Sequence, residues 1–321
     1  MRLRLSSLSL CLRPSQLHIQ ARARSLSNSA SSMSSFVIPS TANNPDFPVH
    51  LTPDLSQDQL QSFPAFKIWL STLQRSLSRQ ANPSHEFHAA PYILRRIQVQ
   101  AVDFFGGNRL GFVKLRADVS NDHGEKLPGS VFLRGGSVGM LLILQPTDAS
   151  SSSALSPDSE KHAILTIQPR IPAGSLAFPE IPAGMLDDSG TFAGGAAKEI
   201  EEETGLVVSH DELVDLTALA NTLSKQSQSQ QEQEDGESLQ PGIYPSPGGC
   251  DEFIPLFLCE KRMAQADIDE LQGGLTGLRK HGEKITLKVV RLDELWKEAW
   301  RDGKTLAAWA LYKGLKEEGA I

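Results

Sequence analysis

Cysteine is scarce in this chain of 321 residues, and long apolar runs are missing. The three cysteines, Cys11, Cys250 and Cys259, include no CxxC pair, which argues against a disulfide framework and a structural zinc knuckle. No apolar stretch approaches the roughly 18 to 20 residues that a membrane-spanning helix needs. We therefore expect a soluble body in a reducing compartment or the mitochondrial matrix, with no membrane partner.

The chain also lacks an excess of positive charge. Asp and Glu number 38 against 31 Lys and Arg, so the formal net charge is −7. Nucleic-acid-binding proteins usually carry a basic face, so we expect no nucleic-acid partner. A negative protein that handles a polyanion needs bound cations or locally placed Arg and Lys, which is a weak indication of a metal site.

Acidic residues are absent from the first 45 residues, which are rich in serine, leucine and arginine. This composition is typical of an organelle-targeting presequence, and a disordered cytosolic tail is the alternative. We predict a mitochondrial leader, ahead of a plastid one. A start at Met33 would give a cytoplasmic form without the leader. Residues 1–45 are therefore left out of the fold prediction.

Residues 46–135 are predicted to form a small N-terminal domain with one helix and an antiparallel β-meander. Residues 46–62 are rich in proline and polar residues, and we expect an extended lead-in. Residues 64–79 place apolar side chains at helical spacing. Turn signals containing Gly, Asn or Pro separate runs rich in β-branched and aromatic residues. The strands that we expect are 92–105, 111–119 and 131–133.

Residues 136–321 read as a second, mixed domain. Its strands and helices do not alternate regularly, which favours a mixed sheet between helical layers over a doubly wound parallel sheet. A polar, low-complexity stretch at about 225–240 is predicted to be a disordered surface insertion. We expect strands at 138–144, 163–167, 253–259 and 285–290, and helices at 191–204, 264–272, 292–300 and 304–317.

The informative segment is 184–206, GMLDDSGTFAGGAAKEIEEETGL. Its helix, which Gly205 should end, carries Glu199, Glu202 and Glu203 at i, i+3 and i+4, on one face. Three like charges repel, and they crowd the end of the helix where the macrodipole disfavours anions. A divalent cation would remove both penalties. The alternative is a solvated acidic helix, which is common in proteins.

The segment resembles the Nudix box, a loop–helix–loop of the Nudix hydrolases. Two positions depart from that pattern. Gly190 stands where a Glu is expected, with Asp187 and Asp188 just upstream, and Lys198 stands where the family has Arg and so loses its bidentate fork. The resemblance covers about residues 136–290 and rests on Gly184, Lys198, Glu199, Ile200, Glu202, Glu203, Gly205 and Leu206.

This resemblance implies an α+β chain, in which a Nudix α/β/α sandwich with a mixed sheet follows the smaller N-terminal β domain. It also implies metal-dependent hydrolysis of a diphosphate bond, with Mg²⁺ or Mn²⁺ as cofactor. A catalytically silent nucleotide-sugar binding module is the alternative that Gly190 and Lys198 support. Relatives pair through such N-terminal domains, so a homodimer is expected.

Two motifs upstream of the box, QPRIP at 168–172 and EIPAG at 180–184, resemble the ADP-ribose and ADP-sugar diphosphatase branch. The resemblance implies that Arg170 and Glu180 belong to the substrate site. It also implies that the Ala183 carbonyl is a metal ligand together with Glu199, Glu202 and Glu203. An ordinary surface arginine is the alternative for Arg170.

Two segments further along complete the predicted site. A Ser-Pro-Gly turn ending at Gly248, followed by Glu252, marks the same branch and implies substrate contacts there, with a tight strand entry as the alternative. Relatives often carry a Glu-bearing loop before the next strand. Glu283 is therefore the candidate base or extra ligand, with His281 or a plain exposed loop as alternatives.

These residues together predict cleavage of ADP-glucose or ADP-ribose to AMP and a sugar phosphate by attack of a metal-bound water. UDP-glucose, GDP-mannose, a dinucleotide or FAD remain alternative substrates. The catalytic candidates are Glu199, Glu202, Glu203 and Glu283.

Overall fold

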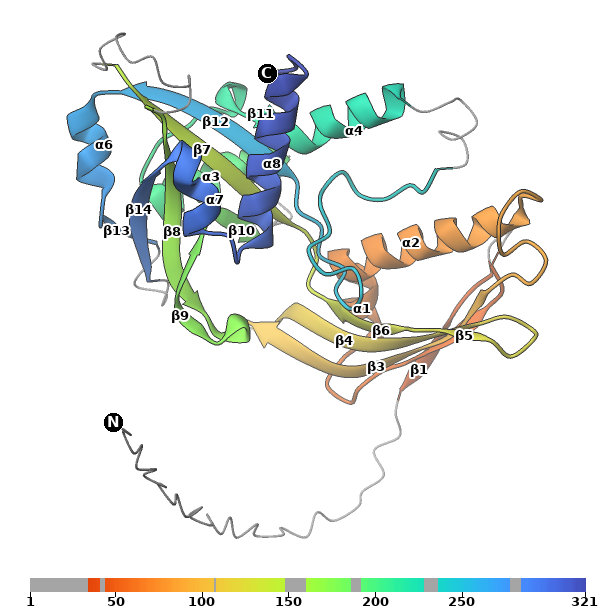
Figure 1. Ribbon diagram of the computed structural model, residues 1–321. Coiled ribbons are helices and arrows are strands. Elements are labelled where there is room, and N and C mark those ends of the chain that lie inside the picture. The colour runs from red at the N-terminus through yellow and green to blue at the C-terminus, as the bar shows by residue number, and fades with distance from the viewer. Residues whose placement is uncertain are drawn as a thin grey trace, which may run out of the picture. The chain divides into compact units, whose positions relative to one another are not determined.

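The computed structural model describes residues 34–40, 44–106, 108–147, 160–185, 192–227, 236–277 and 284–321. These residues build two β-sheets with helices packed against them (Figure 1). Within them, no helix has both the length and the apolar character needed to cross a membrane.

The first sheet has the strand order β1-β2-β3-β4-β5, and β6 also pairs with β4. Helices α1 (Gln57–Ser62) and α2 (Pro64–Ser78) pack on it through Leu60 and Phe66, which meet Ile97 and Leu115 in one buried cluster. A short 3₁₀ turn, η1 (Arg79–Ala81), ends α2. The strands are β1 (Ser35–Ile38), β2 (Phe47–His50), β3 (Ile93–Phe105), β4 (Arg109–Ser120), β5 (Lys126–Leu127) and β6 (Ser130–Leu133).

Two details of the N-terminal prediction are wrong. The sheet is not purely antiparallel, because β2 runs parallel to β3, with Val49 opposite Ile97. The helices between these strands form a crossover, which parallel neighbours require. β1 falls within residues 1–45, which the fold prediction left out, and pairs with β2 in the first sheet. Residues 46–62 are not merely extended, since they hold β2 and α1, whose N-terminus Ser56 and Gln59 close with a capping box.

The second sheet has the order β11-β12-β7-β8-β14-β13, with β10 paired to β7 and β9 to β8. β12 runs parallel to β7, whereas the other pairs are antiparallel, so the predicted mixed sheet is confirmed. Its strands are β7 (Ser137–Pro146), β8 (His162–Arg170), β9 (Ser175–Glu180), β10 (Ala183–Met185), β11 (Val214–Asp215), β12 (Leu256–Met263), β13 (Leu275–Thr276) and β14 (Ile285–Arg291).

Side chains alternate across β7 and divide the core into two layers. Met140 and Leu142 pack with α3 and α6, whereas Leu141 and Ile143 pack with α4, α7 and α8. Helices therefore cover both faces of the sheet, which confirms the predicted α/β/α sandwich (Figure 1). The helices are α3 (Phe192–Thr204), α4 (Leu216–Gln226), α6 (Gln265–Leu271), α7 (Leu295–Glu298) and α8 (Gly303–Glu317), with 3₁₀ turns η2 (Ile171–Ala173), η3 (His210–Glu212) and η5 (Leu292–Glu294).

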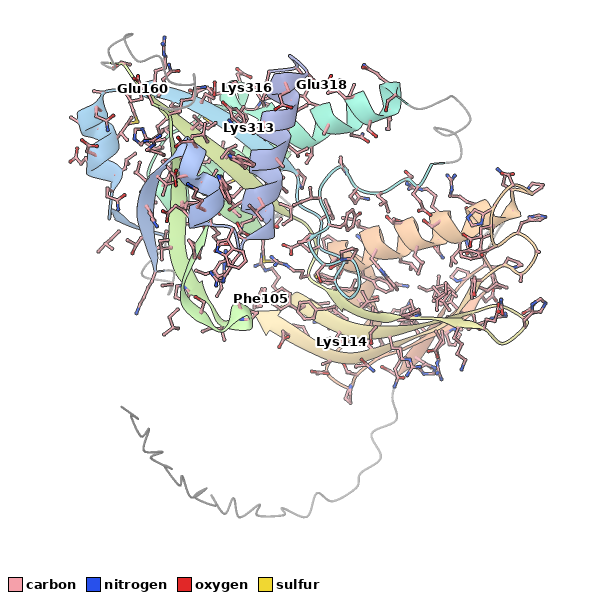
Figure 2. All side chains as sticks on the ribbon, viewed as in Figure 1. Phe105, Lys114, Glu160, Lys313, Lys316 and Glu318 are labelled. Carbon is pink, nitrogen blue, oxygen red and sulfur yellow. The ribbon has the colours of Figure 1, made fainter. Side chains whose placement is uncertain are left out.

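Some element boundaries differ from the prediction. β12 starts at Leu256 rather than at residue 253, because Pro255 precedes it and cannot donate to a ladder. The strand continues to Met263, beyond the predicted end at residue 259. α4 reaches residue 226 and so takes the first residues of the predicted insertion. Charged side chains such as Lys313, Lys316 and Glu318 lie at the C-terminal end of α8 (Figure 2), where Lys316 Nζ is 3.1 Å from the Tyr312 hydroxyl.

Candidate active site

Helix α3 is oriented by its apolar side, and this turns its glutamates toward β10. Ala196 and Ile200, one turn apart, are fully buried in the layer beneath the sheet. Gly205 ends the helix in a left-handed conformation, with φ of +75°, and its N–H donates to the Glu201 carbonyl at 2.9 Å. The position of the glutamates therefore follows from local sequence together with the packing of these two side chains.

Glu199 lies directly over Gly184 in β10. A Cβ atom added at Gly184 would be only 1.8 Å from the Glu199 Cδ atom. The glycine is therefore required at this point for the carboxylate of Glu199 to reach the strand. Gly184 pairs with Val138 of β7, so the carboxylate stands above the middle of the sandwich domain.

Glu203 is the buried member of the group, with 6% of its surface exposed. One of its carboxylate oxygens accepts the Ala183 N–H at 2.9 Å, and the other accepts the Gln168 amide at 3.3 Å. The pKa of Glu203 is raised to about 8, mainly by burial and also by the charges of Glu199 and Glu180, although the hydrogen bonds from Ala183 and Gln168 oppose the rise. Without a cation, this carboxyl group is largely protonated at neutral pH.

Glu202 has a different environment from its two neighbours. Its side chain is half-buried, and Lys198 Nζ lies 3.9 Å from its Oε1 atom, one turn back along α3. The lysine that replaces the family arginine thus holds this carboxylate through one long contact, without a bidentate fork. The backbone carbonyl of Glu202 accepts the Gly277 N–H at 3.3 Å.

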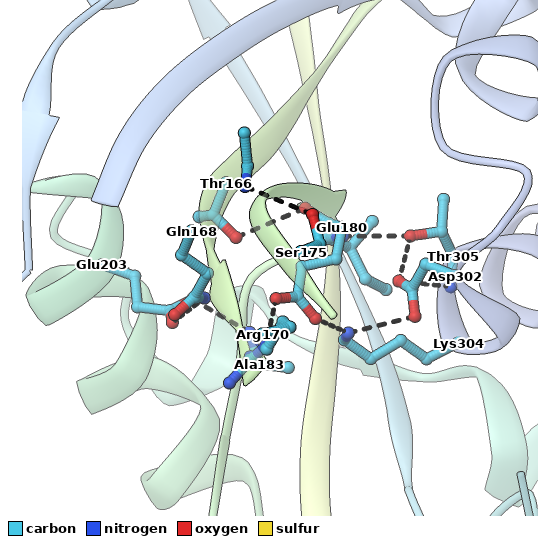
Figure 3. Close-up of polar contacts among 12 residues, drawn as sticks. Thr166, Gln168, Arg170, Ser175, Glu180, Ala183, Glu203, Asp302, Lys304 and Thr305 are labelled. Atoms are coloured by element: carbon cyan, nitrogen blue, oxygen red, sulfur yellow. Dashed lines mark hydrogen bonds and ion pairs between the residues drawn. The ribbon is translucent and has the colours of Figure 1, made fainter. Parts of the chain in front are cut away.

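Arg170 and Glu180 form an ion pair beside this helix (Figure 3). Arg170 Nε donates to Glu180 Oε1 at 2.6 Å, and Glu180 is 2% exposed. Burial would lower the pKa of Arg170, but Glu180, with a contribution from Glu203, outweighs this effect and raises it. The arginine therefore stays cationic, and its side chain remains 40% exposed. The structure brings Arg170, Glu180, Ala183 and Glu203 together, as the motifs predict.

Residues from the start of α8 reach the same group, and the sequence prediction missed them. Lys304 Nζ contacts Glu180 Oε2 and lies 3.1 Å from Asp302 Oδ1. The Thr305 hydroxyl accepts the Ile181 N–H at 3.0 Å and donates to Asp302 at 2.5 Å. The pattern Asp302-Gly-Lys-Thr305 is typical of a helix N-cap, so the sequence indicates that α8 begins here. It does not indicate that these side chains contact Glu180 and Ile181.

The two remaining described residues of the predicted site, Glu252 and Gly248, make none of the described contacts with the glutamates of α3. Glu252 Oε1 lies 3.0 Å from Arg134 and 2.8 Å from the Ser137 hydroxyl, and Ser137 pairs with Met185 of β10. Gly248 instead lines an apolar cleft of about 530 Å³ beside Trp69 of α2. The glutamates of α3 do not line that cleft, so Gly248 is not brought together with them.

The predicted loop candidates fall outside the described residues, namely Glu283, His281, Asp187, Asp188 and Gly190. The described flank of the Glu283 loop does touch α3. The Thr276 hydroxyl donates to the Glu203 carbonyl at 2.5 Å, and Thr276 pairs with Ile285 across the sheet. The described residues before the 278–283 segment therefore contact the last turn of the glutamate helix, and Ile285, after it, pairs with one of them.

The donor set suits a hard divalent cation. Carboxylate and carbonyl oxygens are the ligands that Mg²⁺ prefers, and Glu199, Glu203 and the Ala183 backbone supply them side by side. Within the described segments, no three His, Cys, Asp or Glu side chains stand ready as a metal centre. Each oxygen of Glu203 accepts one hydrogen bond from the protein and keeps a second lone pair that can ligate a metal ion.

Replacing Gly184 with Ala is expected to lower kcat/KM by roughly 10- to 100-fold, because the new methyl group would displace the Glu199 carboxylate by an ångström or more. Steady-state kinetics against Mg²⁺ concentration would measure the loss. Gly314→Ala in α8, where no atom lies within 4 Å of an added Cβ, is the matched control. Wild-type kinetics in Gly184→Ala would contradict the role of this close approach.

An α/β/α sandwich that carries a glutamate helix against the middle of a mixed sheet defines a Nudix-type domain. A model of the NUDIX domain matches residues 150–309. The protein "Nudix hydrolase 14, chloroplastic" of Arabidopsis thaliana is 35% identical over 306 residues, covering 94% of this chain and 87% of that protein. The chain therefore belongs to the Nudix hydrolase family, as the box predicted.

A solved structure described as an ADP compounds hydrolase also aligns with the chain. It covers 71% of this chain and 98% of its own length, at 12% identity and a TM-score of 0.40.

Proposed function

We propose that this protein hydrolyses the diphosphate bond of a nucleoside diphosphate sugar, with ADP-glucose or ADP-ribose preferred, to give AMP and a sugar phosphate. The observation that carries the proposal is the position of Arg170. Its guanidinium is cationic, partly exposed and within electrostatic range of the buried Glu203. A fixed cation beside a group of carboxylates suits a phosphate chain bridged to the protein by divalent metal ions.

In this proposal the residues of the site divide into metal ligands, a phosphate-binding arginine and a carboxylate that holds the arginine. Mg²⁺ or Mn²⁺ would be held by Glu199, Glu202, Glu203 and the Ala183 carbonyl, and such an ion neutralises diphosphate charge and acidifies a bound water. Arg170 binds the phosphate oxygens. Glu180 holds Arg170 through the 2.6 Å hydrogen bond to Nε.

The proton acceptor and the remaining substrate contacts come from the loops that follow the glutamate helix in sequence. Glu283 is the proposed base, since Thr276 and Gly277, which precede its loop, contact the glutamate helix. Glu252 and Gly248 are proposed to contact the nucleoside sugar, on the strength of the Ser-Pro-Gly motif. The preference for ADP rests on the QPRIP and EIPAG motifs, and UDP-glucose, GDP-mannose and dinucleotides are the alternatives.

A substrate panel tests the proposal. The full chain is incubated with Mg²⁺ and ADP-glucose, ADP-ribose, UDP-glucose or GDP-mannose, and alkaline phosphatase then releases phosphate from the products only. We expect kcat/KM for one ADP compound to exceed that for the UDP and GDP sugars by about tenfold or more, the scale of a few well-placed contacts. Binding of ADP-glucose by calorimetry without any cleavage would instead establish a silent binding module.

Localisation and assembly stay predictions. We propose that the acid-free leader directs the protein to an organelle. The Arabidopsis relative is named as chloroplastic, which makes a plastid as well supported as the predicted mitochondrion. Imaging of residues 1–45 fused to a fluorescent protein in plant cells distinguishes the two, and diffuse fluorescence would reject import. The homodimer is tested by the mass of the protein in light scattering.

A further inference from the structure

Lys304 contacts Glu180, the carboxylate that binds Arg170, although the two residues lie far apart in the sequence. It lies 124 residues after Glu180, near the start of α8, and is only 8% exposed. Its Nζ contacts Glu180 Oε2, whereas Arg170 Nε occupies Glu180 Oε1 at 2.6 Å (Figure 3). The two cations thus share one carboxylate, one oxygen each.

The charges in this buried group balance. Glu180 and Asp302 supply two negative charges, and Arg170 and Lys304 supply two positive ones. Asp302 is fixed in turn, because its other oxygen accepts from the N–H and the hydroxyl of Thr305. A carboxylate with both oxygens occupied has one orientation, so Lys304 determines how Glu180 faces Arg170.

We infer that Lys304 is a positioning residue for Arg170: by occupying Glu180 Oε2 it prevents Glu180 from binding the guanidinium with both oxygens. Without Lys304, the buried Oε2 would lose its partner, and Arg170, which already donates to Oε1 of the same carboxylate, can supply a second N–H. The guanidinium would then form a bidentate pair with Glu180, and one donor would be withdrawn from the phosphate chain. This inference rests on the proposed function insofar as Arg170 contacts substrate.

If Lys304 had a merely structural role, removal of another equally buried lysine of the same domain would have a similar effect on the kinetics. Lys161 offers the comparison, since it is 9% exposed, pairs with Glu260 at 2.8 Å and approaches Tyr312 of α8 at 3.4 Å. Neither of its partners touches Arg170 in the described contacts. Lys161→Met therefore removes an equally buried ammonium from the same domain without affecting the arginine.

The kinetic test uses the full chain and five variants: Lys304→Met, Lys304→Arg, Lys161→Met, Arg170→Ala and the double variant Lys304→Met/Arg170→Ala. We expect Lys304→Met to raise KM about tenfold with a smaller change in kcat, since it removes about one charged hydrogen bond to substrate. Lys304→Arg should recover most of the loss, and Lys161→Met should leave KM unchanged. In an Arg170→Ala background, Lys304→Met should change kcat/KM less than twofold, because the residue through which it acts is gone.

A second measurement does not depend on any substrate. The Arg170 Nε–H signal, assigned by its loss in Arg170→Ala, is followed in arginine side-chain NMR spectra. Lys304→Met should shift this signal, and Lys161→Met should leave it in place. If the wild type cleaves none of the nucleoside diphosphate sugars, the proposed function fails, and this spectrum still decides the inference.

Three results would overturn the inference. One is an unmoved Arg170 Nε signal in folded Lys304→Met, and another is an equal loss of kcat/KM with and without Arg170. If Lys304→Met does not fold, Lys304→Gln is measured instead. Its amide can still donate one hydrogen bond to Glu180 Oε2, so the Arg170 Nε signal should then stay in place. Unfolding of both variants beside a folded Lys161→Met would assign Lys304 to the support of α8 alone.

Discussion

Glu202→Gln is expected to lower kcat by about 10²- to 10⁴-fold, the range for removal of a group that acts in proton transfer or metal binding. The fold should remain intact, because the Glu202 side chain is half-buried and its only described side-chain contact is the 3.9 Å approach of Lys198. The amide keeps the size of the carboxylate and removes its charge, so the change reports on chemistry.

The matched control for this variant is Glu201→Gln. Glu201 is the preceding residue in α3, is exposed, and lies off the face shared by Glu199, Glu202 and Glu203. Single-turnover kinetics with saturating Mg²⁺ and circular dichroism on both variants separate loss of chemistry from loss of structure. Near-normal turnover in Glu202→Gln would remove it from the catalytic set.

Glu203→Gln is expected to stabilise the metal-free protein at alkaline pH. The pKa of Glu203 is about 8 in the folded protein against an ordinary value of 4.5, so the fold favours the protonated form. Its contribution to stability is complete below pH 4.5 and is lost as the pH rises through the folded value near 8. Glutamine resembles the protonated acid and does not titrate, so the variant escapes this loss.

The gain should be on the order of 2 to 4 kcal/mol in the free energy of unfolding at pH 8, and near zero at pH 4.5, at about 1.4 kcal/mol per pKa unit. Denaturant unfolding in EDTA across this pH range measures it. Saturating Mg²⁺ should reverse the order of the two proteins, because the ion stabilises only the wild-type carboxylate. Equal stabilities in EDTA at both pH values would show that Glu203 ionises freely in the fold.

Local sequence was sufficient for the long elements and for the face of the glutamate helix. The period of two in β4, and the helical spacing of Ala196, Ile200 and the three glutamates, depend on neighbours a few residues away. Short elements such as β1 and β2 were missed, since four residues give too little periodicity. The direction of β2 relative to β3 is a property of the crossover between them and has no local signal.

The sequence by itself determined the family, through the spacing of its motifs, and with the family the α/β/α sandwich. It also indicated that Arg170, Glu180, Ala183 and Glu203 lie close together. Only the tertiary structure decided that Glu203 is buried with a raised pKa, and that Lys304 shares Glu180 with Arg170. Both depend on which side chains surround a carboxylate in space. Those neighbours come from strands and a helix far apart along the chain, so their charges and burial combine only on folding.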